Sequence, residues 1–116
     1  MTDSTGALLQ ALSDPTRRAI FERIARGREM SVAVLTQHAG VSQPAVSQHL
    51  KALQQANLVV GRRQGRNTYY RADPHGLAPL ASWLRQHEAL WAQRLDRLED
   101  YLHSVQRKEK SRGRKR

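Results

Sequence analysis

Residues 42–53, SQPAVSQHLKAL, predict a helix whose two faces have different chemistry. Val46, Leu50 and Leu53 are spaced four and three residues apart, so they share one side of an α-helix and favour burial. Ser42 is a suitable N-cap, and Pro44 falls in the first turn, where its missing N–H is tolerated. The other face carries short or planar uncharged hydrogen-bonding side chains, where a solvated face usually carries Glu and Lys. We therefore expect this face to contact a partner.

The segments on either side of this helix predict a helix-turn-helix followed by a wing. Upstream, helical patterns cover residues 5–12, about 15–26 and 32–39, and Gly40 ends the third of them. Downstream, residues 58–72, LVVGRRQGRNTYYRA, contain two β-rich runs around a Gly-Arg-Asn tip, which predicts a hairpin. The predicted fold class is mainly α with a small β-hairpin: a winged helix-turn-helix with a long C-terminal dimerisation helix.

The last helix is predicted at about residues 76–105, and residues 1–105 are expected to form one domain. Apolar residues recur along this helix at spacings of three and four over about four heptads, with Glu88 as the one charged member. Such a rod is roughly 45 Å long, which residues 1–75 cannot cover. The same helix of a second copy is the simplest partner, in a two-fold dimer. The predicted dimerisation residues are Leu8, Leu12, Leu84, Trp91, Leu95, Leu98 and Leu102.

The formal net charge of +10 at pH 7 indicates a polyanionic partner. Residues 106–116, QRKEKSRGRKR, carry seven basic residues and one acidic residue, with no apolar side chain. We therefore expect these residues to form a basic disordered tail. The tail either improves solubility or adds phosphate contacts. Residues 1–105 keep thirteen basic against nine acidic residues, so the basic excess does not depend on the tail alone.

The uncharged face of residues 42–53 matches what the base edges of a DNA major groove require. The first turns of such a helix enter the groove, where amides and hydroxyls read hydrogen-bonding patterns. A plain polar helix in a bundle is the alternative for this face, and a solvated hairpin is the alternative for the wing. The predicted base contacts are Gln43, Pro44, Ser47 and Gln48, and the predicted backbone and wing contacts are Ser42, Lys51, Arg62, Arg63, Arg66 and Asn67. His49, beside this face, is expected to be a phosphate neighbour or a packing residue.

Three segments resemble the ArsR (ArsR/SmtB-type) family of bacterial winged-helix transcriptional regulators: LSDPTRRAIFERI, VSQPAVSQHLKALQQANLV and GRRQGRNTYYRADP. The resemblance covers roughly residues 7–105, and the C-terminal segment WLRQHEALWAQRLDRLEDYL resembles a metal-independent branch of the family. The resemblance implies a homodimer clasped by the first and last helices. It also implies an inverted-repeat operator near the protein's own promoter, usually bound by a repressor. Base contacts carried over from the family fall on Gln43, Pro44, Ser47 and Gln48.

The absence of Cys excludes disulfides and thiolate metal sites and fits a reducing cytoplasm. Asp73 and His75 match the D-x-H pattern of one family metal site, but His87 is followed three places on by Leu90 rather than by a ligand. A site between subunits stays open as an alternative, built from His87 and Glu88 or from Glu99, Asp100 and His103. We expect no metal and no cofactor.

These patterns predict a cytoplasmic, sequence-specific DNA-binding transcriptional regulator, most simply a homodimeric repressor on an inverted-repeat operator near its own promoter. No enzyme is predicted, because there is no Gly-rich phosphate loop and no supported Ser/His/Asp set. No apolar run spans a membrane, and the N-terminus lacks the basic start of a secretory signal. One alternative is an effector-responsive sensor that releases DNA when a metal or small metabolite binds between subunits; no pattern identifies that effector. The other is a nonspecific architectural DNA-binding protein.

Overall fold

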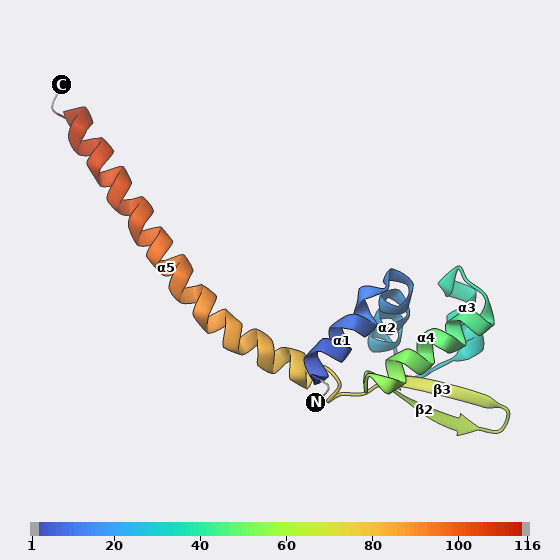
Figure 1. Ribbon diagram of the computed structural model, residues 1–116. Coiled ribbons are helices and arrows are strands. Elements are labelled where there is room, and N and C mark those ends of the chain that lie inside the picture. Colours follow the sequence, from blue (N-terminus) through green and yellow to red (C-terminus); the bar gives the residue numbers. More distant parts are fainter. Residues whose placement is uncertain (1–2, 115–116) are drawn as a thin grey trace. The chain divides into compact units, whose positions relative to one another are not determined.

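The computed structural model describes residues 3–114, in which five α-helices and one three-stranded sheet are formed (Figure 1). In chain order the elements are α1 (Ser4–Ser13), α2 (Pro15–Arg26), β1 (Met30–Ser31), α3 (Val32–Ala39), α4 (Gln43–Gln55), β2 (Val59–Gln64), β3 (Asn67–Ala72) and α5 (Ala78–Arg114). The chain divides into two compact units, residues 1–81 and residues 82–116, and each is considered by itself. The predicted fold class is confirmed.

Short polar residues start the helices of the first unit. The Asp14 carboxylate accepts a hydrogen bond of 3.0 Å from the Arg17 backbone N–H at the start of α2, next to Pro15 in the first turn. That hydrogen bond lowers the pKa of Asp14 below its ordinary value. The Ser42 hydroxyl accepts from the Ala45 N–H at 3.3 Å and so caps α4, as the sequence predicts. Local sequence therefore fixes where α2 and α4 begin.

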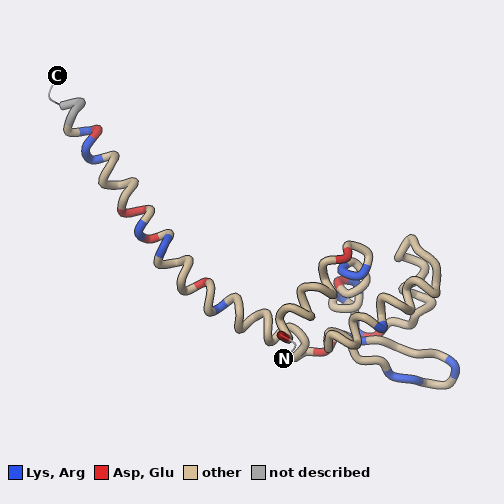
Figure 2. The backbone as a smooth tube through the Cα atoms, in the orientation of Figure 1, with Lys and Arg blue, Asp and Glu red and all other residues tan. Residues whose placement is uncertain are grey.

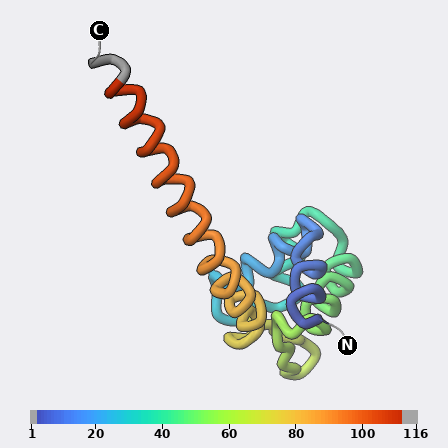
Figure 3. Tube along the Cα trace, turned by 60° about the vertical axis from the view of Figure 1, so that its left-hand side comes forward, coloured from blue at the N-terminus to red at the C-terminus, as the bar shows by residue number. Residues whose placement is uncertain are grey.

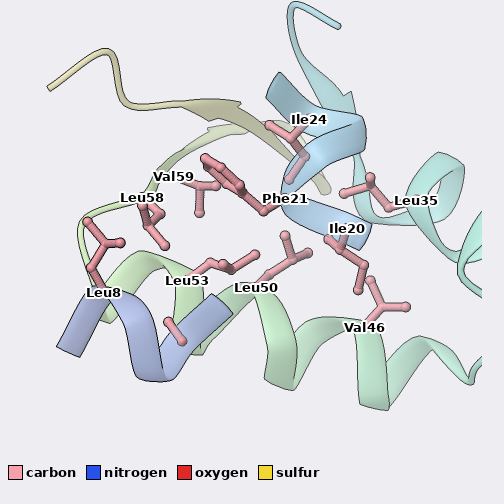
Figure 4. Close-up of a cluster of buried hydrophobic side chains, with 11 residues drawn as sticks. Leu8, Ile20, Phe21, Ile24, Leu35, Val46, Leu50, Leu53, Leu58 and Val59 are labelled. Atoms are coloured by element: carbon pink, nitrogen blue, oxygen red, sulfur yellow. The ribbon is translucent and has the colours of Figure 1, made fainter. Parts of the chain in front are cut away.

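One hydrophobic core holds α1 to α4 and the start of the hairpin together (Figure 4). The three apolar residues of α4 predicted to be buried, Val46, Leu50 and Leu53, are each 0% exposed. Their burial fixes the rotation of α4 about its axis and leaves the opposite face of the helix outside. The complete cluster consists of Leu8, Ala11, Ile20, Phe21, Ile24, Leu35, Val46, Leu50, Leu53, Leu58 and Val59.

The chain leaves α4 through a tight turn that feeds β2. Asn57 has φ of 62°, and its N–H donates to the Gln54 carbonyl at 3.0 Å. The Leu58 N–H donates to the Leu53 carbonyl at 2.9 Å, which completes a Schellman motif with both leucines in the core. Gly76 packs directly against this turn: a Cβ added there would lie 2.4 Å from the Asn57 carbonyl oxygen. This turn therefore requires glycine at position 76.

Replacing Gly76 with Ala is expected to lower the free energy of unfolding by about 1–3 kcal/mol, because the new methyl group must displace backbone. Chemical denaturation followed by circular dichroism measures this change. Gly6→Ala is the matched control, since a Cβ there meets nothing nearer than the Asp3 Oδ2 at 3.5 Å and lies within α1. That control should keep or slightly raise stability. Equal stability of the two variants would show that the turn can move aside.

The sheet has the strand order β1-β3-β2, with antiparallel pairing throughout. β2 and β3 form the predicted hairpin, with Gly65 at φ of 63° and Arg66 between the paired residues Gln64 and Asn67. The sequence patterns did not predict β1, whose two residues pair with Tyr69 and Tyr70 of β3. Through this pairing, the wing is hydrogen-bonded to the segment that leads into α3.

The last helix differs from its prediction at both ends. It starts at Ala78 rather than at about residue 76, and it continues to Arg114. Figure 3 shows it as one continuous helix. The expectation of disorder from residue 106 is therefore wrong for residues 106–114, while residues 115–116 lie outside the described part. Residues 106–110 are Gln, Arg, Lys, Glu and Lys, all good helix formers, and no glycine interrupts the helix before Gly113. The prediction of disorder rested on charge and on the lack of apolar residues, and it did not take this helix propensity into account.

Candidate nucleic-acid interface

Helices α3 and α4 are joined by a short turn that presents the start of α4 to solvent. Gly40 ends α3 in the left-handed conformation, with φ of 69°, and Val41 and Ser42 complete the turn. The apolar side of α4 packs against α2 and α3, because Val46 and Leu50 are completely buried. The arrangement is a helix-turn-helix with the outward face of its second helix free in the described structure.

That outward face carries the residues predicted to contact bases. Gln43, Pro44, Ser47 and Gln48 are all exposed, and they lie in the first two turns of α4. Spacings of four join Gln43 to Ser47 and Pro44 to Gln48, which places the four residues on adjoining parts of one surface. Lys51 is exposed one turn after Ser47. The face therefore combines amide and hydroxyl groups in the middle with a cation at its C-terminal side.

His49 lies beside this face and contacts α2. It is half-buried, and the Arg17 Nε donates a hydrogen bond of 3.3 Å to its Nδ1. This contact links α4 to the first turn of α2. Of the two roles expected for His49, the structure favours the packing role.

The wing carries basic residues along the hairpin, and Figure 2 marks such positions in blue on β2 and near the tip. Arg63, Arg66 and Asn67 are exposed, and Arg66 occupies the loop itself. Tyr70 and Ala72 pack against the core, as alternation along the strand predicts. The exposed basic groups of the wing are therefore available to an anionic partner.

Arg62 differs from these residues because its guanidinium group is already paired with a carboxylate. Its Nη2 lies 2.9 Å from Glu29 Oε2, and its Nε also donates to both Glu29 oxygens, at 3.1 and 3.2 Å. The hydrogen bond from Arg62 and its positive charge lower the pKa of Glu29. Sequence reasoning missed this partner, since 33 positions separate the two residues and only the β1–β3–β2 register brings them together.

The second unit contains α5 from residue 82 onward, and the apolar residues predicted as a seam are exposed along it. Leu95 is 59% exposed, and Trp91 and Leu98 are also more than half exposed. Leu84 and Leu102 continue the seam with about half of each side chain accessible. A heptad stripe of this kind is typical of a helix that packs against another helix.

In the first unit, the expectation that Leu8 of α1 contacts a partner chain needs correction. Leu8 is 1% exposed and belongs to the core of its own protomer, so it is not available to a partner. Leu12 is half-buried against the same core. Leu9 is 46% exposed and is the apolar residue that α1 presents outward. The sequence could not separate these adjacent leucines, because α1 is short and its pattern gives no clear direction.

The candidate metal ligands have other local partners. The Asp73 carboxylate accepts a hydrogen bond of 2.9 Å from the backbone N–H of His75. The ring of His87 stacks on Trp83 with centroids 4.0 Å apart, and its Nδ1 lies 2.9 Å from the Trp83 carbonyl. Within residues 3–114 no three His, Asp or Glu side chains gather in a way that could hold a metal ion. In the same range, no helix combines the length and the apolar character needed to cross a membrane.

Comparison with known proteins places this geometry in a family. Residues 12–62, from the end of α1 to the middle of β2, match a family model described as a helix-turn-helix domain. An HTH-type transcriptional regulator of Mycobacterium tuberculosis is 54% identical over 71 residues, which cover 61% of this chain and 65% of that protein. The transcriptional repressor SdpR of Bacillus subtilis is 32% identical over 77 residues, 66% of this chain and 84% of SdpR.

An ArsR-like transcriptional regulator from Rhodococcus has a similar structure, with a TM-score of 0.69 and 33% identity over 84% of this chain and 91% of that one. This chain belongs to the ArsR family. A second ArsR-type likeness is the homodimeric winged helix-turn-helix DNA-binding domain from Mycobacterium bovis, with a TM-score of 0.60 and 28% identity over 75% and 80% of the two chains.

Membership of the ArsR family confirms the resemblance seen in the three sequence segments and the winged helix-turn-helix fold. The relatives compared above are named as transcriptional regulators or repressors. The chain spans just under two thirds of the length of the Mycobacterium tuberculosis regulator. The family model ends at Arg62, so β3 and α5 lie beyond it.

Proposed function

We propose that this ArsR-family chain is a sequence-specific DNA-binding transcriptional regulator, a homodimeric repressor that binds an inverted repeat near its own promoter in the cytoplasm. The observation that carries the proposal is the outward face of α4, where Gln43, Pro44, Ser47 and Gln48 are exposed around the N-terminal turns of a helix-turn-helix. Being named a transcriptional repressor, SdpR supports the regulatory part of the proposal.

The chemistry of this face suits base edges in a major groove. The amides of Gln43 and Gln48 can each donate and accept, which matches the N6 and N7 edge of adenine. Ser47 can donate to or accept from either kind of base. The ring of Pro44 is apolar and can lie against a thymine methyl. A helix face that contacts only solvent usually carries Glu and Lys rather than uncharged amides and hydroxyls.

Around this reading face, the basic groups supply contacts with phosphates. Lys51 follows the base-contacting residues on α4, while Arg63, Arg66 and Asn67 extend the surface onto the wing. Ser42, whose backbone starts α4, lies where an N-terminal N–H can meet a phosphate. Phosphate contacts give affinity without sequence preference. Affinity and sequence preference are therefore assigned to different residues and can be tested separately.

Dimerisation is assigned to α5. Its seam of Leu84, Trp91, Leu95, Leu98 and Leu102 is about half exposed or more along its length. A two-fold dimer covers the same seam on both copies and presents two reading helices to two half-sites. The homodimeric state of the Mycobacterium bovis domain supports this assignment.

Selection from a pool of random double-stranded DNA tests the proposal. The purified protein is expected to enrich an inverted repeat whose half-site centres lie about one helical turn, ~10 bp, or somewhat more apart. Binding of a selected site should exceed binding of its scrambled sequence on the order of 10³-fold at physiological salt. A pool that stays random through the selection would instead assign the chain to the architectural DNA-binding class.

Deleting residues 107–116 is expected to weaken binding to the selected site and to scrambled DNA by similar factors. The deleted segment carries seven basic residues and lies beyond the apolar seam. Each phosphate contact that is lost should reduce the slope of log K against log salt by about 0.9. Titrations of both DNAs at several salt concentrations measure the two quantities. An affinity loss confined to the selected site would contradict a phosphate-binding role for this segment.

A further inference from the structure

One face of the small sheet carries a row of side chains that crosses all three strands. Arg62 on β2 pairs in register with Tyr69 on β3, and Tyr69 pairs with Ser31 on β1. Glu29 lies two positions before Ser31, the spacing at which residues of an extended chain share a face. The Arg62 guanidinium lies 5.4 Å from the centre of the Tyr69 ring and reaches Glu29 beyond it. One side chain of the wing thus spans the sheet from edge to edge.

The contacts of Arg62 hold its guanidinium group in one place. The Glu29 carboxylate accepts hydrogen bonds from Nε and from Nη2 of Arg62, at 2.9 to 3.2 Å. The Gln64 side-chain oxygen accepts a further bond, from Nη1, at 2.9 Å. The side chains of Arg62 and Glu29 are 52% and 32% exposed, and an ion pair with that exposure adds little to stability. Its main effect is therefore on geometry, because a planar fork matched to a carboxylate permits few orientations.

The two ends of this contact belong to different functional parts. Arg62 is part of the wing, whereas Glu29 directly precedes β1. The last residue of β1, Ser31, caps α3 by accepting a hydrogen bond of 3.2 Å from the Val34 N–H. The ion pair therefore ties the wing to the first residues of the helix-turn-helix.

We propose that the Glu29–Arg62 ion pair sets the orientation of the wing relative to the helix-turn-helix, and that Arg62 is a positioning residue for DNA binding rather than a phosphate contact. The proposal rests on the proposed function, since it requires that the wing contacts DNA. It revises the role predicted from sequence for Arg62, whose charge is already matched by Glu29.

Neutralising Glu29 distinguishes a phosphate contact from a positioning residue, because the two roles of Arg62 predict opposite changes in DNA affinity. The Glu29→Gln variant has one more net positive charge, and its Arg62 is released from the carboxylate. If Arg62 were a phosphate contact, both changes would favour a polyanion and would tighten binding. If the ion pair positions the wing, the same variant binds DNA more weakly in spite of its added charge.

The experiment measures affinity for the selected site and for scrambled DNA across several salt concentrations. Glu29→Gln is expected to weaken binding of the selected site, on the order of tenfold, a coupling typical of residues in one network. Glu22→Gln, which makes the same charge change at an exposed site on α2, is the control and should bind as tightly as the wild type or slightly more tightly. Thermal unfolding and sedimentation verify that each variant is a folded dimer.

Variants of Arg62 complete the cycle. Arg62→Gln and the double variant Glu29→Gln/Arg62→Gln should lose the same factor as Glu29→Gln alone and share its salt slope, because all three break one unit. Arg62→Lys keeps the charge but not the planar fork, so it should also lose affinity. A phosphate contact would give a different pattern, in which Arg62→Lys is tolerated and Arg62→Gln alone lowers the slope by about 0.9.

Binding by Glu29→Gln that equals or exceeds that of Glu22→Gln would overturn the proposal. Failure of the wild type and of Glu22→Gln to prefer the selected site would instead overturn the proposed function. The two failures are therefore distinguishable within one set of titrations.

Discussion

Replacing Leu95 with Glu is expected to convert the proposed dimer into monomers and to remove most binding to the operator. Leu95 is 59% exposed and lies in the middle of the α5 seam, so the two-fold axis introduces two carboxylates into one apolar interface. Burial of unpaired charge costs several kcal/mol for each ion. A monomer meets one half-site only, and its affinity should fall on the order of 10³-fold or more, towards the nonspecific range.

Sedimentation equilibrium and DNA titration measure the two consequences of this change. Gln93→Glu is the matched control: it adds the same charge two positions away, at an exposed site off the seam. The control should remain dimeric and should bind the operator to within a few-fold of the wild type. A Leu95→Glu chain that stays dimeric at micromolar concentration would contradict the role of the seam.

The double variant Gln43→Ala/Ser47→Ala is expected to lose its preference for the operator while it keeps its fold. Each good contact to a base edge discriminates by about 1–3 kcal/mol, so the two changes should reduce the ratio of operator to scrambled affinity at least tenfold. Both side chains are exposed on α4, and Ala is the best helix former, so stability should not fall.

Fluorescence anisotropy with the two DNAs measures this ratio. Lys51→Ala is the control, because it lies one turn further along the same helix and is proposed to contact phosphate. That control should weaken binding to both DNAs together and leave the ratio nearly unchanged. An unchanged ratio in the double variant would mean that α4 does not read sequence.

Patterns within single elements predicted much of this fold. The burial of Val46, Leu50 and Leu53 followed from spacing alone, and the same spacing left Gln43 and Ser47 outside. The N-cap, the proline in the first turn and the hairpin tip were equally local features. Such features are fixed by a few neighbouring residues, so the sequence suffices to place them.

Contacts between distant segments were not predictable in the same way. The pairing of β1 with β3 involves only two residues, too few for a period-2 pattern, and the Glu29–Arg62 contact depends on it. The burial of Leu8 depends on how α1 lies against the core and not on α1 itself. The helix at residues 106–114 was missed for a different reason. The high charge of this segment was taken to indicate disorder, although Lys, Arg, Glu and Gln favour helix.

Recognition of the operator by the outward face of α4 can be tested by repeating the selection from random DNA with Gln43→Ala/Ser47→Ala beside the wild type. Both proteins have the same α5 and the same wing, so any change in the selected sequence comes from α4. The wild type is expected to enrich an inverted repeat, and the variant is expected to lose its preference at matching positions in both half-sites. Enrichment of the same sequence to the same degree by the variant would contradict this role of α4.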